Sequence, residues 1–328
     1  MGCMYSVEVC AGAGGQALGL ERAGFRHEAL VEIDPWACKT LRLNRPKWKV
    51  CECDIAEIPA QKYKDIELYA GGLPCPPFSV AGKQLGKEDE RNLFPIALEQ
   101  VAQCRPRAVM IENVRGLLDP CFAPYRQWIE ANLRKQGFAF VDWQLVNAEQ
   151  FGVPQQRPRV LLVALRGNAA NRFRWPAQTR RAPTVGEVLF DLMSSRQWNG
   201  AAEWKLRAAR VAPTIVGGSK KHGGPDLGPT RARKAWAQLG VNGLGIADQP
   251  PDADFPADAM PKLTVRMAAR LQGFPDDWSF AGSKTRAYRQ VGNAFPPPVA
   301  YKVAKSIAEA LGSRVRTEKL QSLERSAA

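Results

Sequence analysis

A cysteine and a glutamate that each follow an apolar run have side chains suited to covalent and proton-transfer chemistry. Cys75 lies in Gly71-Gly72-Leu73-Pro74-Cys75-Pro76-Pro77, where the prolines restrict the backbone and fix the thiol on a stiff loop. A thiol with fixed geometry is a candidate nucleophile, although a lone cysteine is usually structural. Glu112 follows Ala108–Ile111, and burial there would raise its pKa toward that of a proton donor. An ion pair or a helix cap is the alternative role for Glu112.

Glycines and two arginines mark further candidate positions. The turn Gly12-Ala13-Gly14-Gly15 lets the backbone pass close to a ligand, and Glu32, after the next apolar run, suits ribose hydroxyls. The turn departs from Gly-x-Gly-x-x-Gly, which disfavours a dehydrogenase. Arg157 and Arg159 lead into another apolar run. Because buried arginines need carbonyl or phosphate partners, we expect both to face the site, with a surface ion pair as the alternative.

Alternating strand and helix patterns predict the elements that position these residues. Apolar, β-branched runs predict buried strands at Tyr5–Val9, Ala29–Ile33, Ile66–Ala70, Ala108–Ile111 and Val160–Leu165. Helical patterns cover Gln16–Ala23, Pro35–Asn44, Leu93–Cys104, Pro124–Gln136, Thr264–Gln272 and Val299–Leu311. This order predicts an α/β fold with a mostly parallel sheet covered on both faces. Ligands of such sheets bind at the carboxyl ends of the strands, where the candidate residues fall.

Positive charge is concentrated in one stretch of the 328-residue chain. The formal net charge is +14, and residues 166–235 hold fourteen basic against four acidic residues. This stretch shows no steady helical or strand period, and it interleaves glycines with Trp198 and Trp204, while Trp236 follows it directly. Basic and aromatic side chains together suit phosphate contact and base stacking, so a nucleic-acid partner is expected. A solvated, loop-rich domain without a ligand is the alternative.

Composition argues against several other classes. None of the eight cysteines forms a Cys-x-x-Cys pair and only two histidines are present, so we expect no structural zinc site and no disulfide framework. No apolar run approaches the about eighteen residues that span a bilayer. We therefore expect a soluble, cytoplasmic protein without a metal and without a membrane association.

Together these segments resemble the cytosine-C5 DNA methyltransferases over nearly the whole chain. The matching segments are Cys10–Gly15, Val31–Asp34, Cys53–Ile55, Gly72–Cys75, Arg91–Phe94, Glu112–Val114, Gln155–Arg159, Arg270–Pro275 and Gly292–Ala294. The resemblance implies a Rossmann-like S-adenosylmethionine-dependent methyltransferase fold with a smaller, loop-rich target-recognition domain. It implies a catalytic domain over residues 1–178, a recognition domain over 179–262, and a return segment over 263–328 that completes the catalytic domain.

The resemblance also implies a cofactor site for S-adenosyl-L-methionine. Its residues would be Cys10, Gly12, Ala13, Gly14, Gly15, Glu32, Ile33, Asp54, Ile55, Pro74, Leu93, Asn293 and Ala294. Among them, Glu32 would bind the ribose, Asp54 the adenine amino group and Asn293 the methionine end. The family usually carries an aromatic residue at the position of Cys10, so stacking on adenine is expected to be weaker here or to come from elsewhere. Glu8 stands where an aspartate is commoner.

For catalysis the resemblance implies transfer of a methyl group to C5 of a flipped-out cytosine in double-stranded DNA. Cys75 would be the nucleophile, Glu112 the partner of cytosine N3, and Arg159 a contact to the base carbonyl, whereas Arg157 would hold the loop. The resemblance further implies a monomeric bacterial restriction-modification enzyme, associated with the nucleoid when bound to DNA. The expected DNA contacts are Ser79, Lys83, Lys220, Lys221, His222, Arg231 and Arg233.

Three alternatives compete with this interpretation. A tRNA cytosine-5 methyltransferase shares the fold, but its Cys-Phe-Thr segment is missing from the recognition region. A catalytically silent DNA-binding regulator would not need Cys75, Glu112 and Arg159 together. A nucleotide oxidoreductase would leave the Pro-Cys-Pro loop unexplained.

Overall fold

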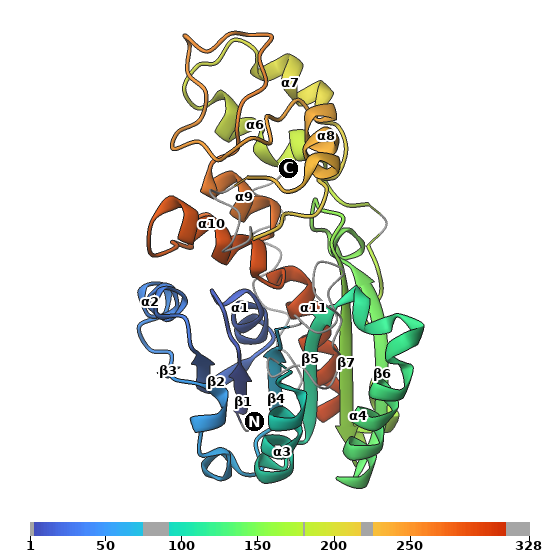
Figure 1. The fold of residues 1–328 in the computed structure, drawn as a ribbon. Coiled ribbons are helices and arrows are strands. Elements are labelled where there is room, and N and C mark those ends of the chain that lie inside the picture. The colour runs from blue at the N-terminus through green and yellow to red at the C-terminus, as the bar shows by residue number, and fades with distance from the viewer. Residues whose placement is uncertain (1–2, 75–91, 180, 218–225, 313–328) are drawn as a thin grey trace.

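The computed structural model describes residues 3–74, 92–179, 181–217 and 226–312, which form a seven-stranded sheet flanked by helices (Figure 1). The strands are β1 (Met4–Val9), β2 (Phe25–Glu32), β3 (Val50–Glu52), β4 (Leu68–Gly72), β5 (Ala108–Val114), β6 (Phe138–Asn147) and β7 (Pro158–Arg166). Their order is β3-β2-β1-β4-β5-β7-β6. The first five strands in that order pair in parallel, while β7 runs antiparallel to both β5 and β6. The predicted α/β fold with a mostly parallel sheet is confirmed.

Helices cover both faces of this sheet. Their bounds are α1 Gly15–Arg22, α2 Pro35–Asn44, α3 Phe94–Cys104, α4 Ala123–Lys135, α5 Ala169–Arg172, α6 Val185–Ser194, α7 Ala201–Arg207, α8 Thr230–Gln238, α9 Val265–Leu271, α10 Lys284–Asn293 and α11 Pro297–Leu311. Short 3₁₀ turns lie at Ile55–Glu57, Ala60–Tyr63, Arg115–Leu118, Pro120–Phe122 and Ala148–Phe151. In the described part of the chain no helix is long and apolar enough to cross a membrane.

Successive strand residues point to opposite faces, which builds two separate cores. Val7, Tyr69 and Ile111 pack with α3 and α4 on one face. Leu68 and Met110 pack on the other face, with α11 and the last turn of α1. Strands buried on both faces show continuous apolar runs in their sequence, which explains why these five strands were predicted. Strand β2 begins at Phe25, before its predicted start at Ala29.

The basic region contains helices that its sequence did not indicate. They are α6, α7 and α8, which span ten, seven and nine residues. Trp198, Trp204 and Trp236 are at most 3% exposed and pack in a core with α9 and α10. The expectation that these tryptophans stack on nucleic acid is therefore wrong, because their large apolar surfaces are used to build this core.

Figure 1 shows α6, α7 and α8 beyond one end of the sheet, with α9 and α10 between them and the strands. Leu263, Met267 and Tyr288 belong to the same core as α6, α7 and α8. The segment after residue 262 therefore supports the basic region as well as the sheet. The division at residues 178 and 262 stays a prediction.

Candidate active site

A cavity of about 740 Å³ opens where the carboxyl ends of the parallel strands meet. The residues that line it include fourteen of those predicted from the sequence: Cys10, Gly12, Ala13, Gly15, Glu32, Ile33, Asp54, Ile55, Pro74, Leu93, Glu112, Arg159, Asn293 and Ala294. Gly14 supports this wall from behind, since a Cβ there would lie 2.7 Å from Leu41 and 2.9 Å from Trp278.

The glycine turn after β1 is shaped by positive φ angles and close packing. Gly12 and Gly14 have φ of 53° and 86°, a region that glycine adopts without strain. Gly15 begins α1, and a Cβ there would collide with the carbonyl oxygen of Phe295. The Nε1 of Trp278 donates to the carbonyl of Ala13 at 3.2 Å. The turn is thus fixed against the return segment, with its backbone exposed to the cavity.

Glu32 is held at the end of β2 by two backbone N–H groups. Its Oε2 accepts from Gly12 N at 2.7 Å, and its Oε1 accepts from Asp34 N at 2.8 Å. Asp34 in turn caps α2 by accepting from Trp36 N at 2.8 Å. Burial raises the pKa of Glu32, and these backbone hydrogen bonds oppose the rise. A carboxylate fixed in this way keeps lone pairs free for a vicinal diol.

The neighbouring wall combines one more carboxylate with apolar surface. Asp54 Oδ1 accepts from Ala56 N at 2.9 Å, which positions the start of a 3₁₀ turn. Ile33 is 65% exposed although it is a large apolar residue, and Leu93 lines the same cavity. Cys10 stands after β1, where burial raises the pKa of its thiol to about 12, so the thiol is neutral.

Glu112 and Arg159 form an ion pair deep in the cavity. Their Oε1 and Nε atoms are 2.9 Å apart, and the side chains are only 13% and 16% exposed. The pairing of β5 with β7 explains this contact, because Glu112 lies opposite Leu161 and therefore diagonal to Arg159 on the same face. Burial raises the pKa of Glu112, while the charges of Arg159 and Arg157 oppose the rise. A carboxyl in this setting can donate or share a proton.

Arg157 serves a different purpose from Arg159. It is 1% exposed and donates to the carbonyls of Ile215 at 2.7 Å, Gly292 at 2.6 Å and Ala294 at 3.0 Å. The expectation that Arg157 faces the site is wrong, because backbone carbonyls take up its guanidinium away from the cavity lining. These contacts agree with the loop-holding role that the resemblance implied.

Two sets of cavity residues escaped the sequence analysis. Residues 214–217 of the basic region line the cavity, as do Trp36, Arg286 and Arg289. A Cβ at Gly217 would collide with Asn293 Oδ1, and one at Gly292 would collide with the backbone of Gly217. These glycines were the available signal, because such close backbone approach needs residues without a side chain.

Several predicted residues are not placed by the structure or lie away from the cavity. Cys75, Ser79, Lys83, Lys220, Lys221 and His222 lie outside the described residues. Arg231 and Arg233 are on α8, and Arg233 Nη2 donates to Thr230 Oγ1 at 3.2 Å. Neither arginine lines the cavity. Within the described ranges, no group of three His, Cys, Asp or Glu residues could hold a metal ion.

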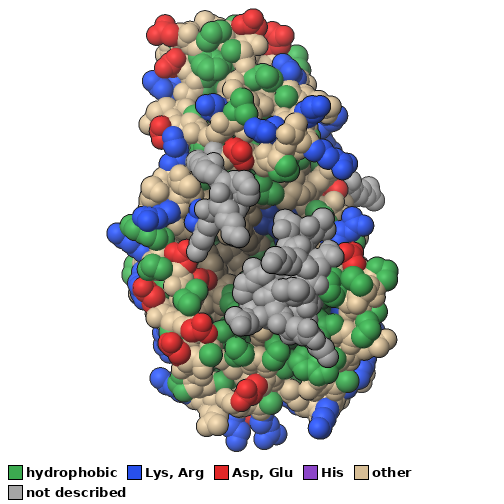
Figure 2. All heavy atoms as spheres, viewed as in Figure 1, with side chains coloured by type: hydrophobic (Ala, Val, Ile, Leu, Met, Phe, Trp, Pro, Cys, Tyr) green, Lys and Arg blue, Asp and Glu red, His purple; other side chains and the backbone are tan. Residues whose placement is uncertain are grey.

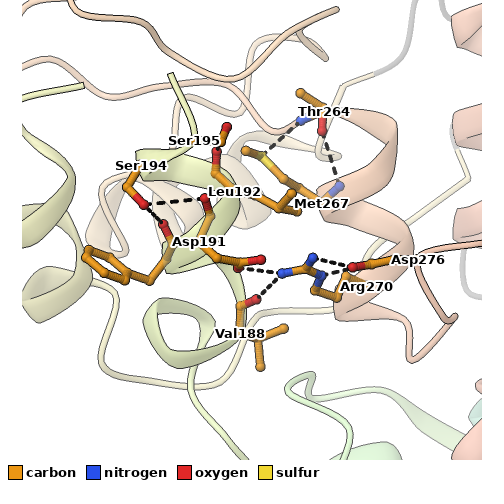
Figure 3. Close-up of polar contacts among 10 residues, drawn as sticks. Val188, Asp191, Leu192, Ser194, Ser195, Thr264, Met267, Arg270 and Asp276 are labelled. Atoms are coloured by element: carbon orange, nitrogen blue, oxygen red, sulfur yellow. Dashed lines mark hydrogen bonds and ion pairs between the residues drawn. The ribbon is translucent and has the colours of Figure 1, made fainter. Parts of the chain in front are cut away.

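Arg270 of α9 connects α6 to the segment after residue 262 (Figure 3). Its Nη1 donates to the carbonyl of Val188 at 3.0 Å and to Asp191 Oδ1 at 2.5 Å, both on α6. Its Nε and Nη2 bind Asp276, with Nε to Oδ1 at 3.0 Å. These hydrogen bonds from Arg270 lower the pKa of Asp276. One guanidinium thus fixes α6 against α9.

Comparison with known proteins assigns this arrangement to a family. Residues 4–309 match the family model described as C-5 cytosine-specific DNA methylase. The chain belongs to this family. It is 54% identical to Type II methyltransferase M.NaeI of Lentzea aerocolonigenes, covering 93% of this chain and 75% of the relative. It is 53% identical to Type II methyltransferase M.NgoMIV of Neisseria gonorrhoeae, covering 93% of this chain and 97% of the relative. The protein is therefore a DNA cytosine-5 methyltransferase.

Solved structures show the same fold at low sequence identity. A putative DNA modification methyltransferase encoded within an Escherichia coli prophage has a TM-score of 0.65 at 21% identity, covering 94% of this chain and all of that chain. A mutant of Spodoptera frugiperda DNMT2 has a TM-score of 0.66 at 18% identity, covering 93% and 99%. The Rossmann-like methyltransferase fold predicted from the sequence is confirmed.

Proposed function

We propose that this methyltransferase transfers a methyl group from S-adenosyl-L-methionine to C5 of a flipped-out cytosine in a specific double-stranded DNA sequence. The observation that carries the proposal is the Glu112–Arg159 pair, buried in the same cavity as the Glu32 carboxylate and the Gly12 turn. One cavity thereby holds both a carboxyl that can donate a proton and a carboxylate that can bind a ribose. Pro74 lines that cavity, and Cys75 follows it directly in the sequence.

The residues present fit the cofactor. The fixed carboxylate of Glu32 can accept hydrogen bonds from both ribose hydroxyls, while Ile33 offers exposed apolar surface to the adenine. Asp54 can accept from the adenine amino group, and Asn293 lines the part of the cavity formed by the return segment. When bound, S-adenosylmethionine supplies an electrophilic methyl group on a sulfonium.

The protein's task is to make cytosine C5 nucleophilic. The thiolate of Cys75 adds to C6, and Glu112 shares or donates a proton at N3, which places electron density on C5. Arg159, paired with Glu112, would contact the base carbonyl. After C5 has taken the methyl group, loss of the C5 proton expels the thiol and restores the aromatic ring. Only the few per cent of a free thiol that is ionised at neutral pH would react, so positive surroundings such as Arg159 would favour the thiolate.

The base must leave the duplex before this chemistry can occur, because its neighbours shield C6. Flipping costs a few kcal/mol, which contacts to the surrounding DNA must offset. We propose that Arg231 and Arg233 of α8, together with Ser79, Lys83, Lys220, Lys221 and His222, supply contacts to bases and phosphates. We further propose a monomer that acts in the bacterial cytoplasm, on nucleoid DNA.

Replacement of the nucleophile tests this mechanism. The variant Cys75→Ala is expected to reduce methyl transfer by at least about a thousandfold, since no covalent adduct forms. Transfer is measured as tritium from labelled cofactor entering duplex DNA, with tRNA as a parallel substrate. DNA binding by Cys75→Ala is expected to stay within about threefold, as no charge is removed.

One control and two contrary outcomes complete the test. Cys121→Ala removes an exposed cysteine and should leave transfer unchanged. Retained transfer in Cys75→Ala would show that the nucleophile is misassigned, and label entering only tRNA would overturn the DNA substrate.

A further inference from the structure

Helix α10 presents two arginines to the cavity. Arg286 and Arg289 both line it, together with Asn293 near the end of the helix. Spacings of three and four residues place all three side chains on one helical face. The sequence assigned DNA contacts to other segments and gave α10 no part in them, so these two cations have no role in the mechanism described above.

Neither arginine has a polar partner within the described part of the chain. Arg286 and Arg289 form no hydrogen bond or ion pair there, and the Nε of Arg289 is buried without an acceptor. The arginines of the β7 segment differ, because Arg157 binds three carbonyls and Arg159 binds Glu112. The Nε of Arg157 also lacks an acceptor, but its two Nη atoms are bound, whereas no guanidinium nitrogen of Arg289 has a partner among the described residues. Because a buried N–H without an acceptor is unfavourable, the Arg289 guanidinium is available to an anion from outside the chain.

Arg286 is held in place although it has no counter-ion. Its guanidinium carbon lies 4.6 Å from the ring centroid of Trp36, and Lys39 Nζ lies 5.6 Å from the same centroid. Gly282 leaves space for this stack, since a Cβ there would lie 3.0 Å from the Trp36 ring. Cation–π contact orients the cations without neutralising them. We call the group Trp36, Lys39, Arg286 and Arg289 the α10 rim.

The position of α10 indicates which anion the α10 rim can bind. The helix lies between the recognition helices and the sheet (Figure 1). Figure 2 shows a hollow at this level of the molecule, with lysine and arginine side chains beside it over α10. A duplex that delivers a base into the cavity must run its backbone past this opening. The guanidinium of an arginine can donate two parallel hydrogen bonds to phosphate oxygens. Such contacts fix the register of the duplex without reading its sequence.

We propose that the α10 rim binds phosphodiester groups of the DNA beside the target cytosine, with Arg286 and Arg289 as the direct contacts. This inference rests on the proposed function. It assigns the return segment a share of DNA binding in addition to its support of the cavity. The two sides of the cleft then hold the duplex: α8 from the recognition region and α10 from the return segment.

The test compares DNA binding and cofactor binding in full-length variants. Arg286→Ala and Arg289→Ala are each expected to weaken binding of specific and unrelated duplexes alike, by about fivefold at low salt. Each variant should also reduce the slope of log K against log salt by about 0.9, the value for one lost phosphate contact. Fluorescence anisotropy of labelled duplexes gives both quantities, and calorimetry gives the affinity for S-adenosylmethionine, expected to stay within twofold.

Matched variants separate the possible outcomes. Arg134→Ala removes an exposed arginine of α4 and should change neither quantity, while Arg286→Lys and Arg289→Lys keep the charge and should recover most of the salt slope. Unchanged DNA affinity and salt slope in both alanine variants would overturn the inference. Weakened cofactor binding with unchanged DNA binding would also overturn it, assigning the arginines to the methionine carboxylate. Failure of the wild-type protein to methylate DNA would instead contradict the proposed function.

Discussion

At the scale of single residues, Glu8 shows how burial sets chemistry in this fold. It lies on β1 between two core residues, is 1% exposed, and its Oε2 has no hydrogen-bond partner among the described residues. Burial is the main cause that raises the pKa of Glu8 well above its ordinary value, and the charge of Glu32 adds to the effect. A carboxyl in such surroundings is neutral at pH values at which an exposed one is ionised.

The raised pKa of Glu8 predicts a pH-dependent stability. Above the ordinary carboxyl pKa the folded state binds more protons than the unfolded state, so the free energy of unfolding falls as pH rises. The fall is about 1.4 kcal/mol per pH unit until the folded-state pKa is reached. Glu8→Gln should remove the contribution of Glu8 to this pH dependence and should be more stable than wild type at pH 7. Urea unfolding at pH 5, 6 and 7 measures the free energy of unfolding of both proteins.

Glu99→Gln, at an exposed position of α3, is the matched control, and its free energy of unfolding plotted against pH should run parallel to that of wild type. Parallel lines for Glu8→Gln as well would mean that Glu8 is ionised in the folded protein.

At the scale of elements, the predictable parts are those with a strong local signal. The five predicted strands were found because strands buried on both faces are continuous apolar runs, in the antiparallel β7 as in the four parallel strands. Helix α2 begins where Asp34 caps it ahead of Pro35. The strand β3 is three residues long, and β6 is a partly exposed edge strand, so neither has a clear pattern. In the site, Thr214 and Ile215 were missed because their place in the cavity depends on tertiary contacts, of Thr214 with Gln156 and of Ile215 with Gln155 and Arg157.

The junction between α6 and α9 makes a prediction at this scale. Arg270→Ala removes the hydrogen bonds to Val188 and Asp191, so α6 should open locally more often. Loss of about 1.4 kcal/mol would raise amide exchange in α6 about tenfold, with little change in α11. Hydrogen exchange followed by mass spectrometry measures both helices.

Arg266→Ala is the control on the same helix, because Arg266 donates only to the carbonyls of Pro275 and Trp278 within its own segment. Equal exchange in α6 for both variants would show that Arg270 does not hold the junction.

At the scale of the whole molecule, the basic region and the sheet are not independent. Leu18 of α1 shares a core with Trp204 of α7 and Tyr288 of α10. Gly217 and Asn293 approach so closely that a Cβ could not fit between them. Residues 214–217 of the basic region therefore form part of the cavity wall. The net charge of +14 can direct DNA toward this cavity, although the cavity lining itself includes several carboxyl groups.

Arg157 is the residue through which this integration can be tested. Its guanidinium joins the segment before β7 to Ile215 of the recognition region and to Gly292 and Ala294 of the return segment. A lysine keeps the charge but cannot reach all three carbonyls, so Arg157→Lys should lower the free energy of unfolding by about 3 kcal/mol or more. Arg174→Lys is the matched control, since Arg174 donates to two carbonyls from an exposed position. Urea unfolding followed by tryptophan fluorescence and circular dichroism should give separate transitions in Arg157→Lys and coincident ones in wild type. Coincident transitions with wild-type stability in Arg157→Lys would mean that the shared core, without this guanidinium, suffices to hold the two parts together.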